Sequence, residues 1–218
     1  MDGITDSRYI VNKFLKNRIV KCIQSISSKC VLDVGCGKKP YMRYFPNTTM
    51  YIGIDKSTPS ADVIAVGEYL PFRNKAFDTV ICTQVLEHVE DPVRVLKEMN
   101  RILQGRGVLI LSTHGFWIEG HERTDYWRWT LQGLYRILNQ TGFDVIESYS
   151  MEPYSSFFQF ISLFIPTNLI GKLFQAFINL LCDLAIKILR DRGVRLHAVH
   201  VIKAMRRPYK NDEENRLY

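Results

Sequence analysis

Two short apolar segments in the first third of the chain each end in a residue pattern that restricts the fold. The first carries Asp33 and runs directly into a turn with Gly35 and Gly37, while the second, residues 51–54, ends on Asp55. Glycines let backbone N–H groups at such a turn approach a ligand closely. An acid about 20 residues further on suits the hydroxyls of a ribose. The pair predicts two strands that border a nucleoside-binding pocket.

The glycine turn lacks the spacing of a dinucleotide-binding site. The fingerprint G-x-G-x-x-G, counted from Gly35, requires glycine at position 40, where the sequence has Pro40. The turn instead has the pattern D-x-G-x-G, with Asp33 two residues before the first glycine. An acid there is tolerable for a ligand without a pyrophosphate. This pattern alone leaves open a tight turn that binds nothing.

Apolar strand-like segments alternate with segments of helical spacing along the chain. Strands are expected at 30–34, 50–54, 62–66, 77–82, 108–112, 143–149 and 198–204. Helices are expected at 7–27, 91–104 and 131–140. The alternation predicts an α/β fold with a Rossmann-like, doubly wound, mostly parallel seven-stranded sheet. Ligands of such sheets bind at the carboxyl ends of the strands, and the residues predicted there are Asp33, Asp55, Thr83 and His114.

Several further motifs follow in order between residues 70 and 113. They read LPF from Leu70, FDTV from Phe77, LEHVEDP from Leu86 and E-x-x-R-x-L from Glu98. Together with D-x-G-x-G, they resemble the motifs of class I S-adenosylmethionine (SAM)-dependent methyltransferases of the type 11-like group. The resemblance covers roughly residues 29–149 and implies a methyltransferase (EC 2.1.1 class) with SAM as its cofactor.

The resemblance implies roles for individual residues around the cofactor. Asp33, Gly35 and Gly37 would surround the methionine end of SAM. Asp55 would bind the ribose hydroxyls, and Thr83 would lie near the methyl group that is transferred.

Three positions depart from the family pattern, of which the smallest is Arg106, in place of the first glycine of a pair after the E-x-x-R-x-L motif. Lys39 occupies the place of a third glycine, and Val66 occupies the place of an acid that faces adenine. Gly67 and Glu68 are therefore the expected adenine contacts, through their backbone groups. His88, in the LEHV motif, is interpreted as fixing local structure.

Residues 114–130 follow the fifth predicted strand, where the acceptor should bind. His114 or His121 is the expected general base, because imidazole titrates near neutrality. The side chains expected to bind the acceptor are Asp125, Tyr126, Trp127 and Arg128. The alternative is a structured loop with packed aromatic rings and a local Asp–Arg salt bridge. Segments similar to H-x-x-x-D-Y-W-R-W-T in glycan-related methyltransferases favour a hydroxyl acceptor.

An apolar helical insertion is predicted at about 153–192, before the last strand. Pro166 interrupts its first uncharged run, which is too short to span a bilayer as one helix. Two interpretations stay open: a lid or homodimer face, and a contact with a membrane interface. The second would be helped by basic residues, namely Lys172, Lys187, Arg190, Arg192 and Arg195. The predicted organisation is an N-terminal helix in 1–28, a methyltransferase domain in 29–207 and a flexible tail in 208–218.

Composition limits the remaining choices. The five cysteines form no C-x-x-C pair, so we expect reduced thiols and no metal site. The N-terminus has no apolar signal segment, so we expect a cytoplasmic protein. Peripheral contact at the inner membrane face is the alternative. The net charge of +7 suits an anionic partner, but no RNA-binding module stands out, so nucleic acid is not the expected partner. We therefore predict O-methylation of a small-molecule, glycan or lipid-linked acceptor. The alternatives are a catalytically silent module for membrane or protein association and a nucleic-acid methyltransferase.

Overall fold

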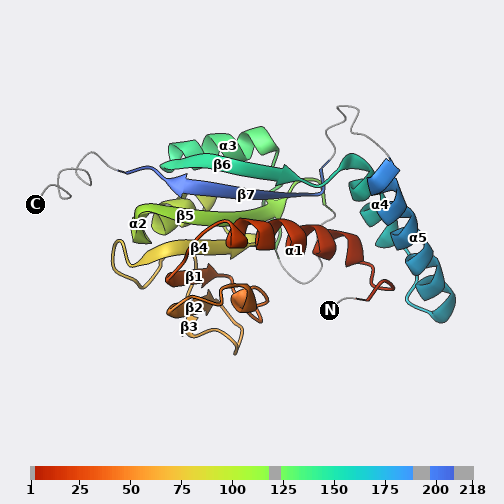
Figure 1. The fold of residues 1–218 in the computed structure, drawn as a ribbon, viewed down its shortest axis with the longest axis horizontal. Coiled ribbons are helices and arrows are strands. Elements are labelled where there is room, and N and C mark those ends of the chain that lie inside the picture. The colour runs from red at the N-terminus through yellow and green to blue at the C-terminus, as the bar shows by residue number, and fades with distance from the viewer. Residues whose placement is uncertain (1–2, 118–123, 189–196, 209–218) are drawn as a thin grey trace, which may run out of the picture.

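One mixed sheet of seven strands organises the part of the chain that the computed structural model describes, which is residues 3–117, 124–188 and 197–208. The sheet order is β3-β2-β1-β4-β5-β7-β6 (Figure 1). The strands are β1 (Cys30–Val34), β2 (Met50–Asp55), β3 (Val63–Ile64), β4 (Phe77–Thr83), β5 (Leu103–His114), β6 (Phe143–Ser150) and β7 (Val199–Arg206). β1 to β5 pair in parallel, and β7 lies antiparallel between β5 and β6. The predicted fold class is confirmed.

Helices cover both faces of the sheet. On one face, α2 (Pro92–Ile102) and α3 (Leu131–Gln140) bury an apolar stripe that includes Leu96 and Leu134. On the other face, α1 (Tyr9–Gln24) buries Phe14 and Ile19 against β5 and β7. The predicted N-terminal helix is thus packed on the sheet.

A local sequence signal sets the start of α2, but not its end. The Asp91 side chain accepts a hydrogen bond from the Arg94 backbone N–H at 2.9 Å, which caps α2. The predicted end of this helix at residue 104, just before Gly105, is wrong, because α2 ends at Ile102 and the next residue, Leu103, already pairs with Phe77 of β4. Tertiary strand pairing therefore ends the helix before the glycine does.

The apolar insertion forms two helices, α4 (Pro153–Ser162) and α5 (Leu169–Ile188), which pack against each other and against α1. They stand at the end of the sheet toward which β6 points, beyond the carboxyl ends of the parallel strands (Figure 1). Most of the predicted flexible tail, from residue 209 on, lies outside the described residues.

Candidate active site

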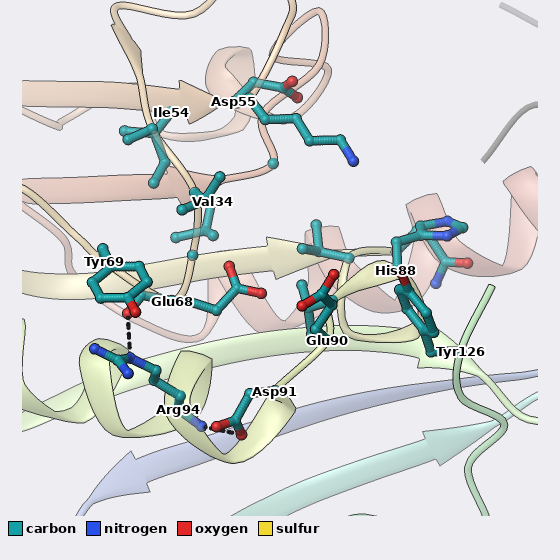
Figure 2. A pocket seen from close by; sticks show the side chains of 18 of the residues that line it. Val34, Ile54, Asp55, Glu68, Tyr69, His88, Glu90, Asp91, Arg94 and Tyr126 are labelled. Atoms are coloured by element: carbon teal, nitrogen blue, oxygen red, sulfur yellow. Dashed lines mark hydrogen bonds between the residues drawn. The ribbon is translucent and has the colours of Figure 1, made fainter. Parts of the chain in front are cut away.

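A cavity of about 650 Å³ opens at the carboxyl ends of β1, β2 and β4. Six of the seven residues predicted to bind the cofactor line it: Gly35, Gly37, Asp55, Gly67, Glu68 and Thr83. Figure 2 shows Glu68 and Tyr69 on one side of this cavity and His88 and Tyr126 on another. The topology thus brings together residues that lie far apart in the sequence.

The turn after β1 needs glycine for two different reasons. Gly35 has φ +67°, and a Cβ there would lie 2.3 Å from a methyl carbon of Val85. Gly37 has φ +50°, and a Cβ there would meet nothing within 4 Å, because the position opens onto the cavity. Lys39 keeps the left-handed backbone of the missing third glycine, with φ 52°. Its ammonium lies 2.6 Å from Asp62, and this ion pair holds the Lys39 side chain away from the cavity.

Asp55 lies at the end of β2 with its carboxylate held by backbone donors. Oδ2 accepts from the Gly37 N–H at 3.2 Å, and Oδ1 accepts from the Ser57 N–H at 3.0 Å and from the Thr58 N–H at 3.3 Å. Because a carboxylate has about four acceptor sites, these three bonds leave acceptor capacity for the ribose, chiefly on Oδ2. The contact with Gly37 also couples the carboxylate to the glycine turn.

Asp33 does not line the cavity, which differs from the prediction. Side chains alternate along a strand, so Asp33 points to the opposite face of the sheet from Leu32 and Val34. Its Oδ2 accepts a hydrogen bond from the Tyr51 hydroxyl at 2.6 Å, and burial raises the pKa of Asp33 to about 6. Asp33 therefore ties β1 to β2 behind the cavity.

The lining of the cavity has more acids than cations. The carboxylates are those of Asp55, Glu68, Glu90 and Asp91. The cations among the lining residues are Lys56 and Arg94. The Arg94 guanidinium donates a hydrogen bond to the Glu68 carbonyl at 3.1 Å and lies over the Tyr69 ring, 3.9 Å from its centroid. Such a balance suits a ligand with a positive charge and disfavours a pyrophosphate.

His88, at the end of a short 3₁₀ helix (Leu86–His88), lines the cavity and has one ring nitrogen fixed. Its Nδ1 lies 2.9 Å from the Thr124 carbonyl oxygen and 3.1 Å from Oδ1 of Asp125. A carbonyl oxygen can only accept, so Nδ1 carries a proton, and in the neutral imidazole the lone pair is then on Nε2. Figure 2 shows the His88 side chain beside Tyr126. Sequence reasoning gave His88 a structural role, although its place just after β4 was a signal for the site.

His114 lies outside the cavity lining, which differs from the expectation that it acts as general base. Its Nδ1 lies 3.4 Å from the Glu87 carboxylate, and its ring stacks on Trp117 with centroids 4.9 Å apart. The Thr113 hydroxyl donates to Glu87 at 2.8 Å. Burial raises the pKa of Glu87 to about 7 and lowers the pKa of His114 to about 4. Both groups are thus neutral over part of the pH range. The other predicted base, His121, lies outside the described residues.

This burial predicts that Glu87→Gln removes a pH-dependent loss of stability. The folded chain holds the Glu87 proton up to about pH 7, whereas an unfolded chain releases it near the ordinary glutamate pKa of 4.5. The contribution of Glu87 is therefore full below pH 4.5 and falls as the pH rises toward 7, by about 3 kcal/mol. The melting temperature of Glu87→Gln, relative to that of the wild type, should be higher at pH 8 than at pH 5. The matched control is Glu90→Gln, an exposed carboxylate. Equal pH dependence in wild type and Glu87→Gln would contradict the prediction.

The four predicted acceptor-binding residues divide between the cavity and its support. Tyr126 lines the cavity. Asp125 and Arg128 form a salt bridge at 2.9 Å, as in the alternative of a local pair, and Asp125 also contacts His88. Trp127 donates its indole N–H to the Val89 carbonyl at 2.8 Å. Three of the four thus hold the segment after residue 124 against the cavity, and their contact with an acceptor stays a prediction.

The sheet order, the glycine turn and the acid-ended second strand define a nucleoside-binding α/β protein. The family model described as "Methyltransferase domain" matches residues 32–111, which include the last three residues of β1, the turn and α2. This match and the fold support a class I SAM-dependent methyltransferase domain in this part of the chain.

Curated relatives match the chain over part of their length. A tRNA U34 carboxymethyltransferase from Nautilia profundicola is 35% identical over a match that covers 50% of this chain and 41% of the relative. A tRNA U34 carboxymethyltransferase from Campylobacter jejuni is 33% identical over a match that covers 40% of that relative. The chain therefore spans about two fifths of the length of these relatives.

Solved structures share the fold at low sequence identity. The cyclase SpnF has a TM-score of 0.62 at 20% identity, with 89% of this chain and 80% of that chain covered. A putative methyltransferase from Bacillus halodurans has a TM-score of 0.58 at 17% identity, with 88% and 100% covered. A fold shared with a cyclase shows that the reaction must be argued from the site.

SAM is the cofactor of this family, and the cavity fits it. Gly37 leaves open space where a side chain would stand, and the Asp55 carboxylate has acceptor capacity for the ribose. The excess of carboxylates in the lining suits the positive sulfonium.

Proposed function

We propose that the chain methylates a hydroxyl group of a small-molecule, glycan or lipid-linked acceptor, with His88 as the general base. The observation that carries the proposal is the setting of His88, which lines the cavity while Thr124 and Asp125 fix its Nδ1. A hydroxyl benefits from a base because it is a weak nucleophile until its proton is removed. An amine acceptor would not require this arrangement.

When bound, SAM supplies an activated methyl group for an in-line displacement. The chain must then align the acceptor and manage one proton. The Nε2 of His88 accepts the proton of the hydroxyl, and the Asp125 carboxylate stabilises the imidazolium that forms. The Arg128 guanidinium holds Asp125 in place, and Tyr126 forms a wall of the acceptor space. Asp55 would hold the ribose hydroxyls, and Gly67 and Glu68 would contact adenine.

The name of the relatives raises the question of the transferred group. A carboxymethyl donor carries a carboxylate beside the reacting carbon and would need a nearby cation. Of the two cations in the described lining, Arg94 is engaged by Glu68 and Tyr69, and Lys56 directly follows Asp55 at the end of β2. Both lie with the residues assigned to the nucleoside, so we favour unmodified SAM as the donor.

Methylation of tRNA is the second candidate. The relatives are named for a tRNA modification, and the net charge of +7 would favour an RNA partner. This weighs against the expectation that nucleic acid is not the partner. We rank tRNA second because the match covers about half of this chain and two fifths of the relative.

Transfer of a radioactive methyl group distinguishes the two candidates. The purified chain, incubated with methyl-labelled SAM, is given separate lipid, glycan, small-molecule and tRNA fractions from the cells that produce it. We expect label in one of the first three fractions, and none with Asp55→Ala. Label confined to tRNA would contradict a small-molecule, glycan or lipid-linked acceptor, and no label in any fraction would contradict the activity itself.

A further inference from the structure

The hairpin of α4 and α5 has its apolar side chains outside. We call its exposed apolar surface the outer face. The outer face consists of Phe157, Phe164, Leu169, Ile170, Leu173, Phe174, Phe177, Leu180 and Leu184. Each of these side chains is between 49% and 78% exposed. A contiguous apolar surface of this kind on a protein marks a place of contact with something else.

The inner side of the same hairpin is polar and hydrogen-bonded. Gln159 is fully buried, accepts from the Val11 N–H at 3.0 Å and donates to the Ser7 carbonyl at 2.7 Å. Asn179 is also fully buried and donates to the Ile4 carbonyl. Further buried polar side chains on this side are Ser155, Ser156, Ser162 and Gln175. A hairpin rotated to bury its apolar side would lose these hydrogen bonds and leave amide groups unpaired. The hydrogen bonds therefore keep the outer face exposed.

The charge on the hairpin favours an anionic partner. No acid occurs from residue 153 to residue 182, and the next one, Asp183, is paired with Lys13 at 2.6 Å. Lys172 is exposed on α5 at the edge of the outer face. A second copy of the chain would present the same acid-free face and leave Lys172 without a counterion. Lipid phosphate groups supply that counterion beside an apolar layer.

We propose that the outer face inserts into the interface of an anionic lipid bilayer, with both helices lying along the membrane plane. The segment Leu169–Ile186 of α5 is long and apolar enough to cross a membrane, with a mean hydropathy of 1.6. Crossing would surround the helix with lipid, whereas Asn179 and Gln175 are buried on the polar inner side. If only the outer face is embedded, its apolar side chains contact the acyl chains, and the polar inner side stays packed against α1.

The membrane contact would also bring the catalytic end of the molecule close to the lipid. Phe160 of α4 contacts Phe116, just after β5, with ring centroids 5.7 Å apart. The hairpin and the cavity both lie at the carboxyl end of the parallel strands (Figure 1). A lipid-linked acceptor would then reach the site from the bilayer, and this last step alone rests on the proposed function.

Co-sedimentation of the full chain with vesicles tests the proposal. Vesicles of phosphatidylcholine are compared with vesicles that also contain phosphatidylglycerol. The wild type is expected in the pellet, most strongly with phosphatidylglycerol. The double variant Leu173→Glu, Phe177→Glu should bind these vesicles at least about tenfold more weakly, because two apolar anchors become charged. The matched control is Ile146→Glu on β6, which changes an exposed apolar side chain away from the hairpin and should bind like the wild type.

Light scattering and SAM binding complete the experiment. An unchanged melting temperature and SAM affinity in the double variant show that a loss of vesicle binding comes from the outer face. Wild-type chain that stays in the supernatant with both vesicle types overturns the proposal. A wild-type dimer that the double variant converts to monomer, with equal vesicle binding by both, would assign the outer face to a second copy. Failure to bind SAM would count against the proposed function alone.

Discussion

Replacing His88 with alanine is expected to lower the rate of methyl transfer by about two to four orders of magnitude. The loss follows because His88 lines the cavity with its Nδ1 held at 2.9 Å from the Thr124 carbonyl, which leaves Nε2 to accept the proton of the acceptor. The affinity for SAM should change little, because the ribose and the methionine end are assigned to other residues. Single-turnover kinetics with the acceptor fraction that takes the label, together with SAM binding, measure the two effects separately.

Two further variants separate a base from a packing residue. His88→Gln keeps much of the side-chain volume without a base, so it should be nearly as slow as His88→Ala. Asp125→Asn keeps the shape beside Nδ1 and removes the negative charge, so it should slow transfer by a smaller factor. His197→Ala is the matched control, since that histidine bonds to the Met151 carbonyl and does not line the cavity. A transfer rate in His88→Gln close to that of the wild type would refute the role of the base.

Replacing Asp55 with alanine is expected to weaken SAM binding by about 100-fold. The estimate follows from losing two charge-assisted hydrogen bonds to the ribose, each worth about 1.5–3 kcal/mol, with part of this offset by desolvation. The variant also loses the bonds from the Gly37 and Ser57 N–H groups, so the glycine turn should loosen. Equilibrium dialysis with labelled SAM measures the affinity.

Controls for Asp55 use the other aspartates of the chain. Asp144 is exposed and pairs with Arg207 at 2.6 Å, and neither residue lines the cavity, so Asp144→Ala should bind SAM like the wild type. Asp55→Asn keeps the size and one acceptor oxygen and should fall between alanine and the wild type. Equal affinity in wild type and Asp55→Ala, at equal melting temperature, would remove Asp55 from the cofactor site.

The parts of the fold predicted correctly are those that depend on local sequence. Strand segments such as 30–34 agree with the structure because a short apolar run that ends at a glycine turn is typical of a buried strand. The cavity could be predicted because parallel strands end at one edge, which brings Gly37, Asp55 and Thr83 together. The positive φ of Lys39 could not be predicted, because a lysine gives no sign that it takes a conformation suited to glycine.

The parts that were missed depend on side-chain direction and on contacts between distant segments. Asp33 and His114 were assigned to the site from their positions at strand ends, but Asp33 points to the other face and His114 is buried beside Glu87. The pairing of His88 with Asp125 joins two segments that sequence spacing does not relate. Similarly, the apolar insertion was evident, but which of its sides faces outward follows only from contacts such as that of Gln159 with α1.

A crystal structure of the chain with S-adenosylhomocysteine tests the central claim most directly. We predict the nucleoside in the cavity at the carboxyl ends of β1, β2 and β4, with both ribose hydroxyls within hydrogen-bonding distance of Asp55. The sulfur should face the space bordered by His88 and Tyr126, where the acceptor hydroxyl would lie. A ligand bound elsewhere, or a sulfur that faces away from His88, would contradict this account of the site.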